Sequence, residues 1–234
     1  SLKGEIDFTV GDLMETLNAG GNVEDVAGVI YKKSDDETYV SERYPAVDMA
    51  DLPLPAYHIL DETHRIGYTK NLERGKIRYP ARSNKYRDIM MARGCTLRCS
   101  FCSVAHLRGP RQKYRRKPVE KLIMEVEQAL EQGVEEIHFF EDLFAENERE
   151  LLEFAEALTK RNLKFPWLQA QGMPLWPVTK DALTALVETG MYRLIAPYES
   201  GNDRALKKCA GKIHSTVAHH HDVTMWSYDL GLEI

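Results

Sequence analysis

The sequence predicts an α/β fold in which a parallel sheet forms part of a (β/α) barrel, with a small α/β appendage at the N-terminus. From residue 88 onward, short apolar runs alternate with amphipathic segments, which is typical of parallel strands joined by right-handed helical crossovers. This alternation gives four strand–helix units and the start of a fifth strand. A full barrel of eight units typically takes about 250 residues, so we expect a partial barrel and a natural chain that continues further.

The appendage is expected to span residues 1–44. A helix over residues 10–17 is predicted by apolar residues at helical spacing and by the Gly20-Gly21 pair that follows them. Residues 29–31 and 38–40 are predicted to form a hairpin around a polar turn. Because this unit is too small to fold alone, we expect it to pack on something larger. Residues 45–86, which contain Pro45, Pro53, Pro55 and Pro80, are predicted to be a linker or a functional cover.

The barrel elements follow one another with clear boundaries. Pro118 stands at the start of one predicted helix and Gly133 just past its end, which is the usual placement of these two residues. The predicted strands are residues 88–92, 137–140, 167–171, 192–196 and 232–234, and the predicted helices are residues 119–130, 151–158, 183–187 and about 214–230.

Composition excludes several classes of protein. Hydrophobic residues make up 43% and charged residues 29%, as in a globular chain rather than a disordered or fibrous one. The net charge of −5 argues against a general binder of nucleic acids or membranes. No apolar run approaches the roughly 18 residues of a membrane span, and the first residues do not resemble a signal peptide. We therefore expect a soluble, cytoplasmic protein.

Three of the four cysteines fall in the pattern Cys95-x3-Cys99-x2-Cys102, and the fourth, Cys209, is expected to be a free thiol. Zinc usually takes four ligands, often from two pairs, and no second pair lies nearby. A disulfide would leave one of the three thiols over. An iron–sulfur cluster suits closely spaced thiolates, and three of them would leave one iron open to a small molecule.

With its aromatic residue before the last cysteine, this pattern resembles that of the radical S-adenosylmethionine (SAM) superfamily. The resemblance covers about residues 87–234. It implies that Cys95, Cys99 and Cys102 hold a [4Fe–4S] cluster whose fourth iron binds SAM, and that Phe101 lies near the adenine. It also implies reductive cleavage of SAM to a 5′-deoxyadenosyl radical that abstracts a substrate hydrogen.

Two further segments resemble the same family. Glu141 and Asp142 follow the second barrel strand, where the family grips the SAM amino group, although this chain has Glu-Asp instead of the frequent Gly-Gly-Glu. A carboxylate suits an ammonium partner. Glu199 and Ser200 follow the fourth strand, where members often bind the ribose or methionyl part of SAM. Both segments follow strand ends, and barrel enzymes keep their sites at the carboxyl edge of the sheet.

The N-terminal part resembles the junction found in cobalamin-dependent radical SAM enzymes, through Gly4-Glu5, the helix, the hairpin and Asp51-Leu52-Pro53-Leu54-Pro55. The resemblance implies three parts: residues 1–44 as the C-terminal remnant of a cobalamin-binding-like domain, residues 45–86 as a linker and residues 87–234 as a partial radical SAM barrel. The Asp-x-His-x-x-Gly motif of the cobalamin domain is absent. Cobalamin is therefore expected in a full-length parent protein.

The leading hypothesis is an enzyme of this branch, either a cobalamin-dependent methyltransferase or a cyclase, acting on a small-molecule substrate with an electron donor such as flavodoxin or ferredoxin. A methylthiotransferase acting on tRNA or a ribosomal protein is the first alternative, although residues 1–86 lack the cysteines of its second cluster. A non-catalytic, metal-stabilised binding module is the second. Nucleic acid is not an expected partner of the leading candidate.

Several other polar residues have an ordinary structural interpretation. The arginine-rich residues 108–117 could contact phosphates, but a solvated loop is the simpler hypothesis. Gln169 and Gln171 could face substrate, yet polar strand residues more often pair locally or face water. His138 is expected to be structural, and His219-His220-His221 are expected to lie on a solvated helix face.

Overall fold

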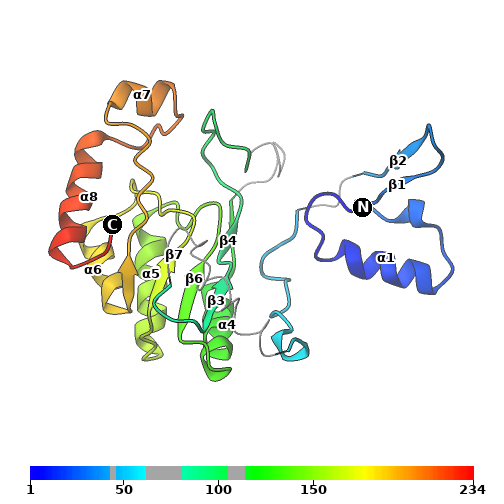
Figure 1. The fold of residues 1–234 in the computed structure, drawn as a ribbon, viewed down its shortest axis with the longest axis horizontal. Helices are drawn as coiled ribbons and strands as arrows, with labels where there is room; N and C mark the ends of the chain where they lie inside the picture. The colour runs from blue at the N-terminus through cyan, green and yellow to red at the C-terminus, as the bar shows by residue number, and fades with distance from the viewer. Residues whose placement is uncertain (43–45, 62–80, 105–113) are drawn as a thin grey trace.

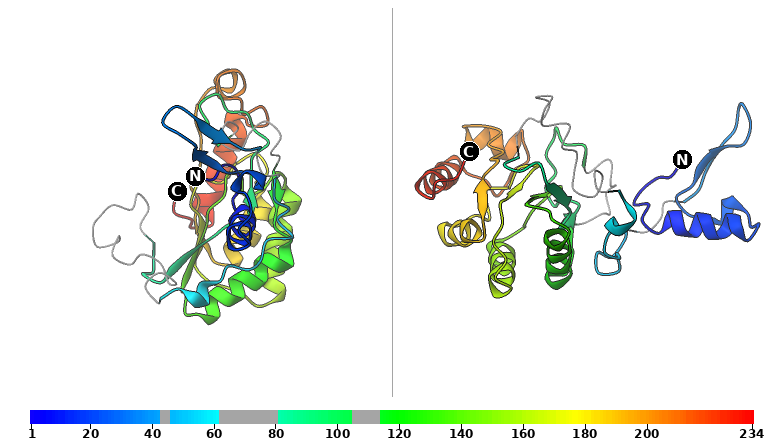
Figure 2. Two further views of the ribbon diagram at one scale, coloured as in Figure 1. Left: turned by 90° about the vertical axis from the view of Figure 1, so that its right-hand side faces the viewer. Right: turned by 60° about the horizontal axis from the view of Figure 1, so that its bottom comes forward.

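The computed structural model describes residues 1–42, 46–61, 81–104 and 114–234. Within them, four parallel strands form one sheet in the order β3-β6-β7-β8, and helices cover one of its faces (Figures 1 and 2). Glu233 pairs in parallel with Arg193 in an isolated bridge beside β8, at the place of the predicted strand 232–234. The strands are β3 (Tyr86–Ile89), β6 (Glu136–Phe139), β7 (Trp167–Gln169) and β8 (Met191–Arg193), and the covering helices are α4 (Val119–Glu131), α5 (Glu148–Lys160), α6 (Lys180–Glu188) and α8 (Val217–Asp229).

This arrangement confirms the predicted α/β fold and the alternation of strands with helices. Capping explains why the helices begin where they do. The side chains of Asn147, Thr179 and Thr216 each accept a hydrogen bond from a backbone N–H in the first turn of α5, α6 and α8, respectively. The right-hand view of Figure 2 shows the four helices side by side along the curved sheet. The described strands form an open arc rather than a closed barrel.

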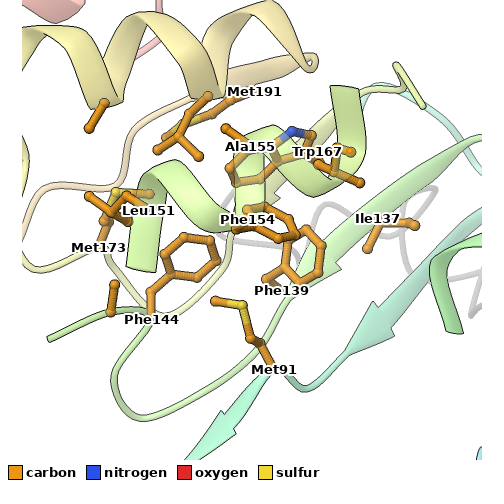
Figure 3. Close-up of a cluster of buried hydrophobic side chains, with 14 of the residues drawn as sticks. Met91, Ile137, Phe139, Phe144, Leu151, Phe154, Ala155, Trp167, Met173 and Met191 are labelled. Carbon is orange, nitrogen blue, oxygen red and sulfur yellow. The ribbon is translucent and has the colours of Figure 1, made fainter. Parts of the chain in front are cut away.

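The core lies between the sheet and the helices (Figure 3). Phe139, Phe144, Phe154 and Trp167 are fully buried there, and their rings meet mainly edge to face with centroids 5.2 to 6.0 Å apart. Such aromatic contacts stabilise a core beyond the area they bury. This packing fixes the ends of β6 and β7 and therefore the positions of the loops that follow them.

The predicted strand over residues 88–92 is wrong in extent, because the chain leaves the sheet after Ile89. Strand β4 (Ala92–Arg93) pairs instead with β5 (Arg115–Arg116) in an antiparallel ribbon. The Met91 N–H donates to the Glu141 carboxylate and the Met91 carbonyl accepts from Lys117, so its backbone bonds lie outside the parallel ladder. The apolar run 88–92 is continuous in the sequence, so its pattern does not indicate that the chain changes from one sheet to another within it.

The appendage contains the predicted helix and hairpin as α1 (Thr9–Asn18), β1 (Ile30–Lys32) and β2 (Thr38–Val40), with a 3₁₀ turn η1 (Val23–Asp25) between them. Its packing differs from the expectation. Val10 and Leu17 on α1 are 44% and 50% exposed, because the contacts with the barrel described below come from residues 5–7 and from Val47. In Figure 1, α1 projects away from the sheet.

Part of the predicted linker 45–86, including Pro45 and Pro80, lies outside the described residues. In the described part, the 3₁₀ turn η2 (Tyr57–Ile59) lies along the outer edge of the sheet, where the Arg87 guanidinium stacks on the Tyr57 ring 3.9 Å from its centroid. Among the described residues, no helix combines the length and the apolar character needed to cross a membrane.

Candidate functional site

The candidate site lies at the carboxyl edge of the sheet, where the segments that follow β4, β6 and β8 meet. The first segment carries the three clustered cysteines, the second Glu141 and Asp142, and the third Glu199 and Ser200. The short helix α7 (Asp203–Lys208), which the sequence analysis missed, follows the third segment. In Figure 1, the segment after β4 and α7 both lie above the sheet.

Cys95, Cys99 and Cys102 are free, half-buried thiols on one loop. Burial, together with the other two thiols and Asp142, raises the pKa of the Cys95 thiol to about 11. Burial also raises the pKa of Cys99, while the ammonium of Lys212 opposes this shift. The Cys95 thiol is therefore within electrostatic reach of the other two thiols and of Asp142. Iron binds cysteine as the thiolate, so binding of a cluster would favour the deprotonated form that burial disfavours.

Among the described residues, no three His, Cys, Asp or Glu side chains converge closely enough to hold a single metal ion. A cubane cluster makes a different demand, because each thiolate binds a different iron and the sulfurs stand further apart than around one ion. Three thiols on a short loop, partly screened from water and close in electrostatic terms, fit that demand.

Glu141 lies directly after β6 and is 2% exposed. Its carboxylate accepts a hydrogen bond from the Met91 N–H at 3.2 Å, and the Gln169 amide lies 3.4 Å from its other oxygen. Burial raises the pKa of Glu141 to about 8, and the Asp142 charge adds to this against the two hydrogen bonds. The side chain thus joins the segment before β4 to the end of β7 and is mostly protonated at neutral pH.

This burial predicts a pH-dependent stability that Glu141→Gln should remove. Between the ordinary pKa of 4.5 and about 8, the folded chain holds a proton that the unfolded chain has lost, so the free energy of unfolding falls as pH rises. Each unit of difference corresponds to about 1.4 kcal/mol. Urea unfolding of the metal-free chain between pH 5 and 8.5 should show a steeper decline in wild type than in Glu141→Gln. The exposed Glu131→Gln should behave as wild type, and equal slopes in all three proteins would contradict the assignment.

Asp142 is less buried than Glu141 and holds the start of the cysteine loop. Its Oδ2 accepts a hydrogen bond from the Gly94 N–H at 3.0 Å. Gly94 has φ +83°, a left-handed conformation that favours glycine, and it is followed directly by Cys95. The tight turn and the carboxylate together fix where the cysteine loop leaves β4.

Gln169 is 1% exposed at the end of β7, and its amide nitrogen lies 3.3 Å from the Glu141 carbonyl. The Gln169 Oε1 is buried and has no hydrogen-bond partner among the described residues. Unsatisfied buried oxygens are uncommon in native proteins, and each asks for an explanation. Gln171 is exposed. The local pairing expected for these residues is therefore confirmed for Gln169, beside the candidate site.

Glu199 adopts φ +59°, which is uncommon for a residue other than glycine and occurs often at functional sites. It forms an ion pair of 3.0 Å with Lys212, whose ammonium also donates to the Pro197 carbonyl at 3.1 Å. Lys212 is 7% exposed, and its charge acts on Cys99. Ser200 Oγ accepts from the Asn202 N–H at the start of α7.

The segment that carries Lys212 packs directly on the cysteine loop. Ser100 Oγ donates to the Cys209 carbonyl. A Cβ on Gly211 would lie 2.6 Å from the Arg98 carbonyl oxygen, so only glycine fits there. Lys212 was missed by the sequence analysis, because an isolated lysine far from the cysteines carries no local signal.

The remaining candidates are placed as follows. Phe101 is 61% exposed on the cysteine loop. Cys209 is an exposed free thiol. His138 is buried, with its Nε2 2.8 Å from the Glu136 carboxylate, which agrees with a structural role.

The expectation of a solvated face for the three histidines is wrong for His220, which is 4% exposed and packs on the Tyr198 ring, because the loop after β8 crosses α8 there.

Residues 108–113 of the arginine-rich stretch lie outside the described residues. The described cations of this stretch are engaged within the chain: Arg115 pairs with Glu5, Arg116 with Glu153 and Lys117 with Glu125.

Comparisons with known proteins agree with this geometry. The model of the radical SAM superfamily matches residues 89–218, more than half of the chain, and the chain therefore belongs to the radical SAM superfamily. The cytidylyl-2-hydroxyethylphosphonate methyltransferase of Streptomyces wedmorensis is 25% identical over 233 residues, covering 90% of this chain and 41% of that protein. The ribosomal protein uS12 methylthiotransferase RimO of Nostoc punctiforme is 30% identical over 118 residues, covering 48% of this chain and 26% of that protein.

Solved structures resemble the fold along nearly the whole chain. The cobalamin-dependent SAM radical enzyme OxsB, with aqua-cobalamin and SAM bound, aligns with a TM-score of 0.71 at 19% identity, covering 98% of this chain and 32% of that one. The radical SAM methyltransferase TsrM from Kitasatospora setae aligns with a TM-score of 0.67 at 14% identity, covering 99% and 44%, respectively. The predicted radical SAM family is confirmed, and OxsB, one of the structures with a similar fold, is a cobalamin-dependent enzyme. The chain spans about two fifths of the length of the Streptomyces methyltransferase it matches.

Proposed function

We propose that this chain is the SAM-cleaving part of a cobalamin-dependent radical SAM methyltransferase or cyclase, with Cys95, Cys99 and Cys102 as ligands of a [4Fe–4S] cluster. The observation that supports the proposal is that three half-buried thiols share one loop at the carboxyl edge of a parallel sheet, where Asp142 acts on Cys95 and the buried Lys212 acts on Cys99. When bound, the cluster supplies the electron that cleaves SAM and the open iron site that holds it.

The other residues divide the remaining work. Asp142, at the less buried position, supplies negative charge for the SAM ammonium, and Glu141 fixes the Met91 backbone behind it. Glu199 and Ser200 line the approach of the ribose or methionyl part, and Phe101 offers an exposed ring to the adenine. Lys212 holds Glu199 in place and puts a positive charge near Cys99, where it offsets part of the charge of the thiolates.

The proposed division of the chain follows the expected boundaries. Residues 1–44 are the C-terminal remnant of a cobalamin-binding-like domain, residues 45–86 the linker and residues 87–234 the partial barrel. Cobalamin, a small-molecule substrate and an electron donor such as flavodoxin or ferredoxin belong to the proposed function of the full-length protein. The similarity to RimO keeps a methylthiotransferase as a second candidate.

The proposal is tested by anaerobic reconstitution of the chain. We expect about four iron atoms per chain, and release of 5′-deoxyadenosine from SAM after reduction with dithionite. Transfer of a methyl group in the presence of cobalamin by the full-length protein would favour the methyltransferase, and transfer of a methylthio group would favour the second candidate. One zinc per chain without SAM cleavage would instead support a non-catalytic binding module.

Replacing Asp142 with asparagine should weaken SAM binding by tenfold or more, because hydrogen bonds to charged groups contribute about 1.5–3 kcal/mol. The measurement is equilibrium dialysis of SAM against the reconstituted protein. The exposed Asp229→Asn on α8 is the matched control and should bind as wild type. An Asp142→Asn protein with wild-type affinity would remove Asp142 from the proposed SAM site.

A further inference from the structure

The cysteine loop is closed at its base by two arginines that face each other. Arg93 of β4 and Arg115 of β5 are cross-strand partners, and the chain between them carries Cys95, Cys99 and Cys102. Like charges directly opposite each other on paired strands are destabilising. The ribbon therefore needs negative charge from elsewhere to stay closed.

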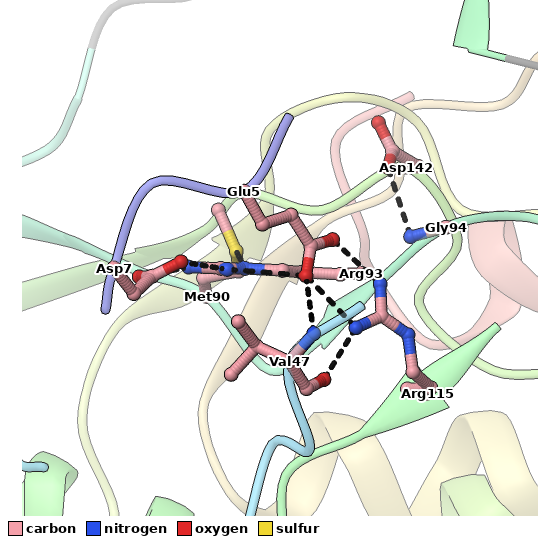
Figure 4. A network of polar contacts seen from close by, with 8 residues as sticks. All are labelled: Glu5, Asp7, Val47, Met90, Arg93, Gly94, Arg115 and Asp142. Carbon is pink, nitrogen blue, oxygen red and sulfur yellow. Dashed lines mark hydrogen bonds and ion pairs between the residues drawn. The ribbon is translucent and has the colours of Figure 1, made fainter. Parts of the chain in front are cut away.

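The N-terminal segment supplies that charge (Figure 4). The Asp7 carboxylate accepts hydrogen bonds from both terminal nitrogens of Arg93, at 2.5 and 2.8 Å. The Glu5 carboxylate accepts hydrogen bonds from both terminal nitrogens of Arg115, at 2.9 and 2.6 Å. Its Oε2 also lies 3.7 Å from Nη1 of Arg93. Glu5 thus lies between the two guanidinium groups. Each arginine forms one bidentate ion pair, Arg115 with Glu5 and Arg93 with Asp7.

These contacts are far more enclosed than ordinary surface ion pairs. The side chain of Glu5 is 5% exposed and that of Arg93 15% exposed. Glu5 also accepts from the Val47 N–H at 3.0 Å, and Arg115 donates to the Val47 carbonyl. Burial alone would raise the pKa of Glu5, but the hydrogen bonds and the charges of Arg115 and Arg93 outweigh it and hold the pKa below its ordinary value.

The same ribbon leads directly to the candidate site. Arg93 is followed by Gly94, whose N–H is held by Asp142, and then by Cys95. Any opening between β4 and β5 would move the start of the cysteine loop relative to Asp142. The position of the first cysteine therefore depends on contacts made by residues 5 and 7, almost ninety positions earlier in the chain.

We propose that Glu5 and Asp7 form a carboxylate clasp, defined by their contacts with Arg93 and Arg115, which closes the base of the cysteine loop and positions it for cluster binding. Glu5 and Asp7 are positioning residues that act through the two arginines. The inference rests on the proposed function, since it concerns the same three thiols. It also couples the cluster to the N-terminal part of the chain, so disturbance of that part weakens the hold on iron.

The test compares Glu5→Gln/Asp7→Asn with wild type after reconstitution. Loss of two carboxylates from a largely enclosed network should speed transfer of iron to a chelator by about tenfold or more. In the metal-free chain, hydrogen exchange of the β4 and β5 amides should speed up as well. Glu153→Gln is the matched control, because it removes a carboxylate from Arg116, the next residue of β5, whose cross-strand partner is Ala92 rather than a cation.

A rescue variant separates charge neutralisation from a general loss of packing. Adding Arg93→Gln to the double variant removes the repulsion between the two arginines, and iron loss should return to within about threefold of wild type. Circular dichroism and thermal unfolding should show that all variants fold.

The outcomes distinguish the clasp from the proposed function. If wild type binds a cluster and the double variant keeps both its iron and its slow exchange, the clasp is overturned while the function stands. A triple variant as defective as the double one would also overturn it. If no protein binds a cluster, the proposed function fails; unchanged exchange of β4 and β5 in the metal-free double variant would then overturn the clasp independently, and faster exchange would support it.

Discussion

Substituting Cys99 with alanine should abolish the brown colour of the reconstituted chain and reduce SAM cleavage to background. Two thiolates would then remain where a cubane with one open iron uses three, and the charges of Lys212 and Glu199 act on Cys99. The measurements are iron and sulfide content, visible absorption and 5′-deoxyadenosine release under reducing conditions. This change has the largest expected effect on activity.

Cys209→Ala is the control for that experiment. Cys209 is also a free thiol next to the cysteine loop, since its carbonyl accepts from Ser100, but its side chain is exposed. It should retain full iron content and SAM cleavage. Unchanged iron in Cys99→Ala, or equal losses in both variants, would contradict the assignment of Cys95, Cys99 and Cys102 as the ligands.

Phe154→Ala should have the largest effect on stability, about 3–5 kcal/mol in the free energy of unfolding. The Phe154 ring is fully buried and meets Phe139, Phe144 and Trp167 edge to face with centroids 5.2 to 5.8 Å away. Its removal leaves a cavity between α5 and the sheet that rigid neighbours fill only in part. Because the same aromatic cluster supports the ends of β6 and β7, binding of SAM should weaken too.

Leu152→Ala on the same helix is the matched control, since Leu152 is 37% exposed and lies outside the core. Its cost should stay below about 1 kcal/mol. Chemical unfolding of the metal-free chain at one pH measures both variants. Similar losses in the two would mean that the aromatic cluster does not carry the core of the described barrel.

The elements that could be predicted are those with a strong local signal. Helices α4, α5 and α6 each bury an apolar face and are bounded by proline, glycine or a capping residue, so their existence follows from spacing and boundary residues. Helix α8 buries His220, Val223 and Ser227, and its prediction depended on Gly231 at its end. The family was predicted from the resemblance of the Cys95-x3-Cys99-x2-Cys102 pattern to that of the radical SAM superfamily. The acidic pair after β6 was found from its position at the end of a strand.

The features that were missed depend on contacts between distant segments. The ribbon of β4 and β5 forms because Met91 bonds to Glu141 and Lys117 instead of continuing the parallel ladder. Lys212 comes close to Cys99 only when the loop after α7 folds onto the cysteine loop. The pairing of Glu5 and Asp7 with Arg115 and Arg93 forms only when the fold brings these distant residues together. Periodicity describes one element at a time, so it carries no information on such pairings.

In the proposed site, SAM occupies an iron position left open by three cysteine ligands. The most direct measurement is the electron paramagnetic resonance spectrum of the reduced, reconstituted chain with and without SAM. If SAM binds the unique iron of a [4Fe–4S] cluster, its addition should change the spectrum of the reduced cluster. A cluster signal that stays identical at saturating SAM, or no cluster signal after full reconstitution, would contradict the account.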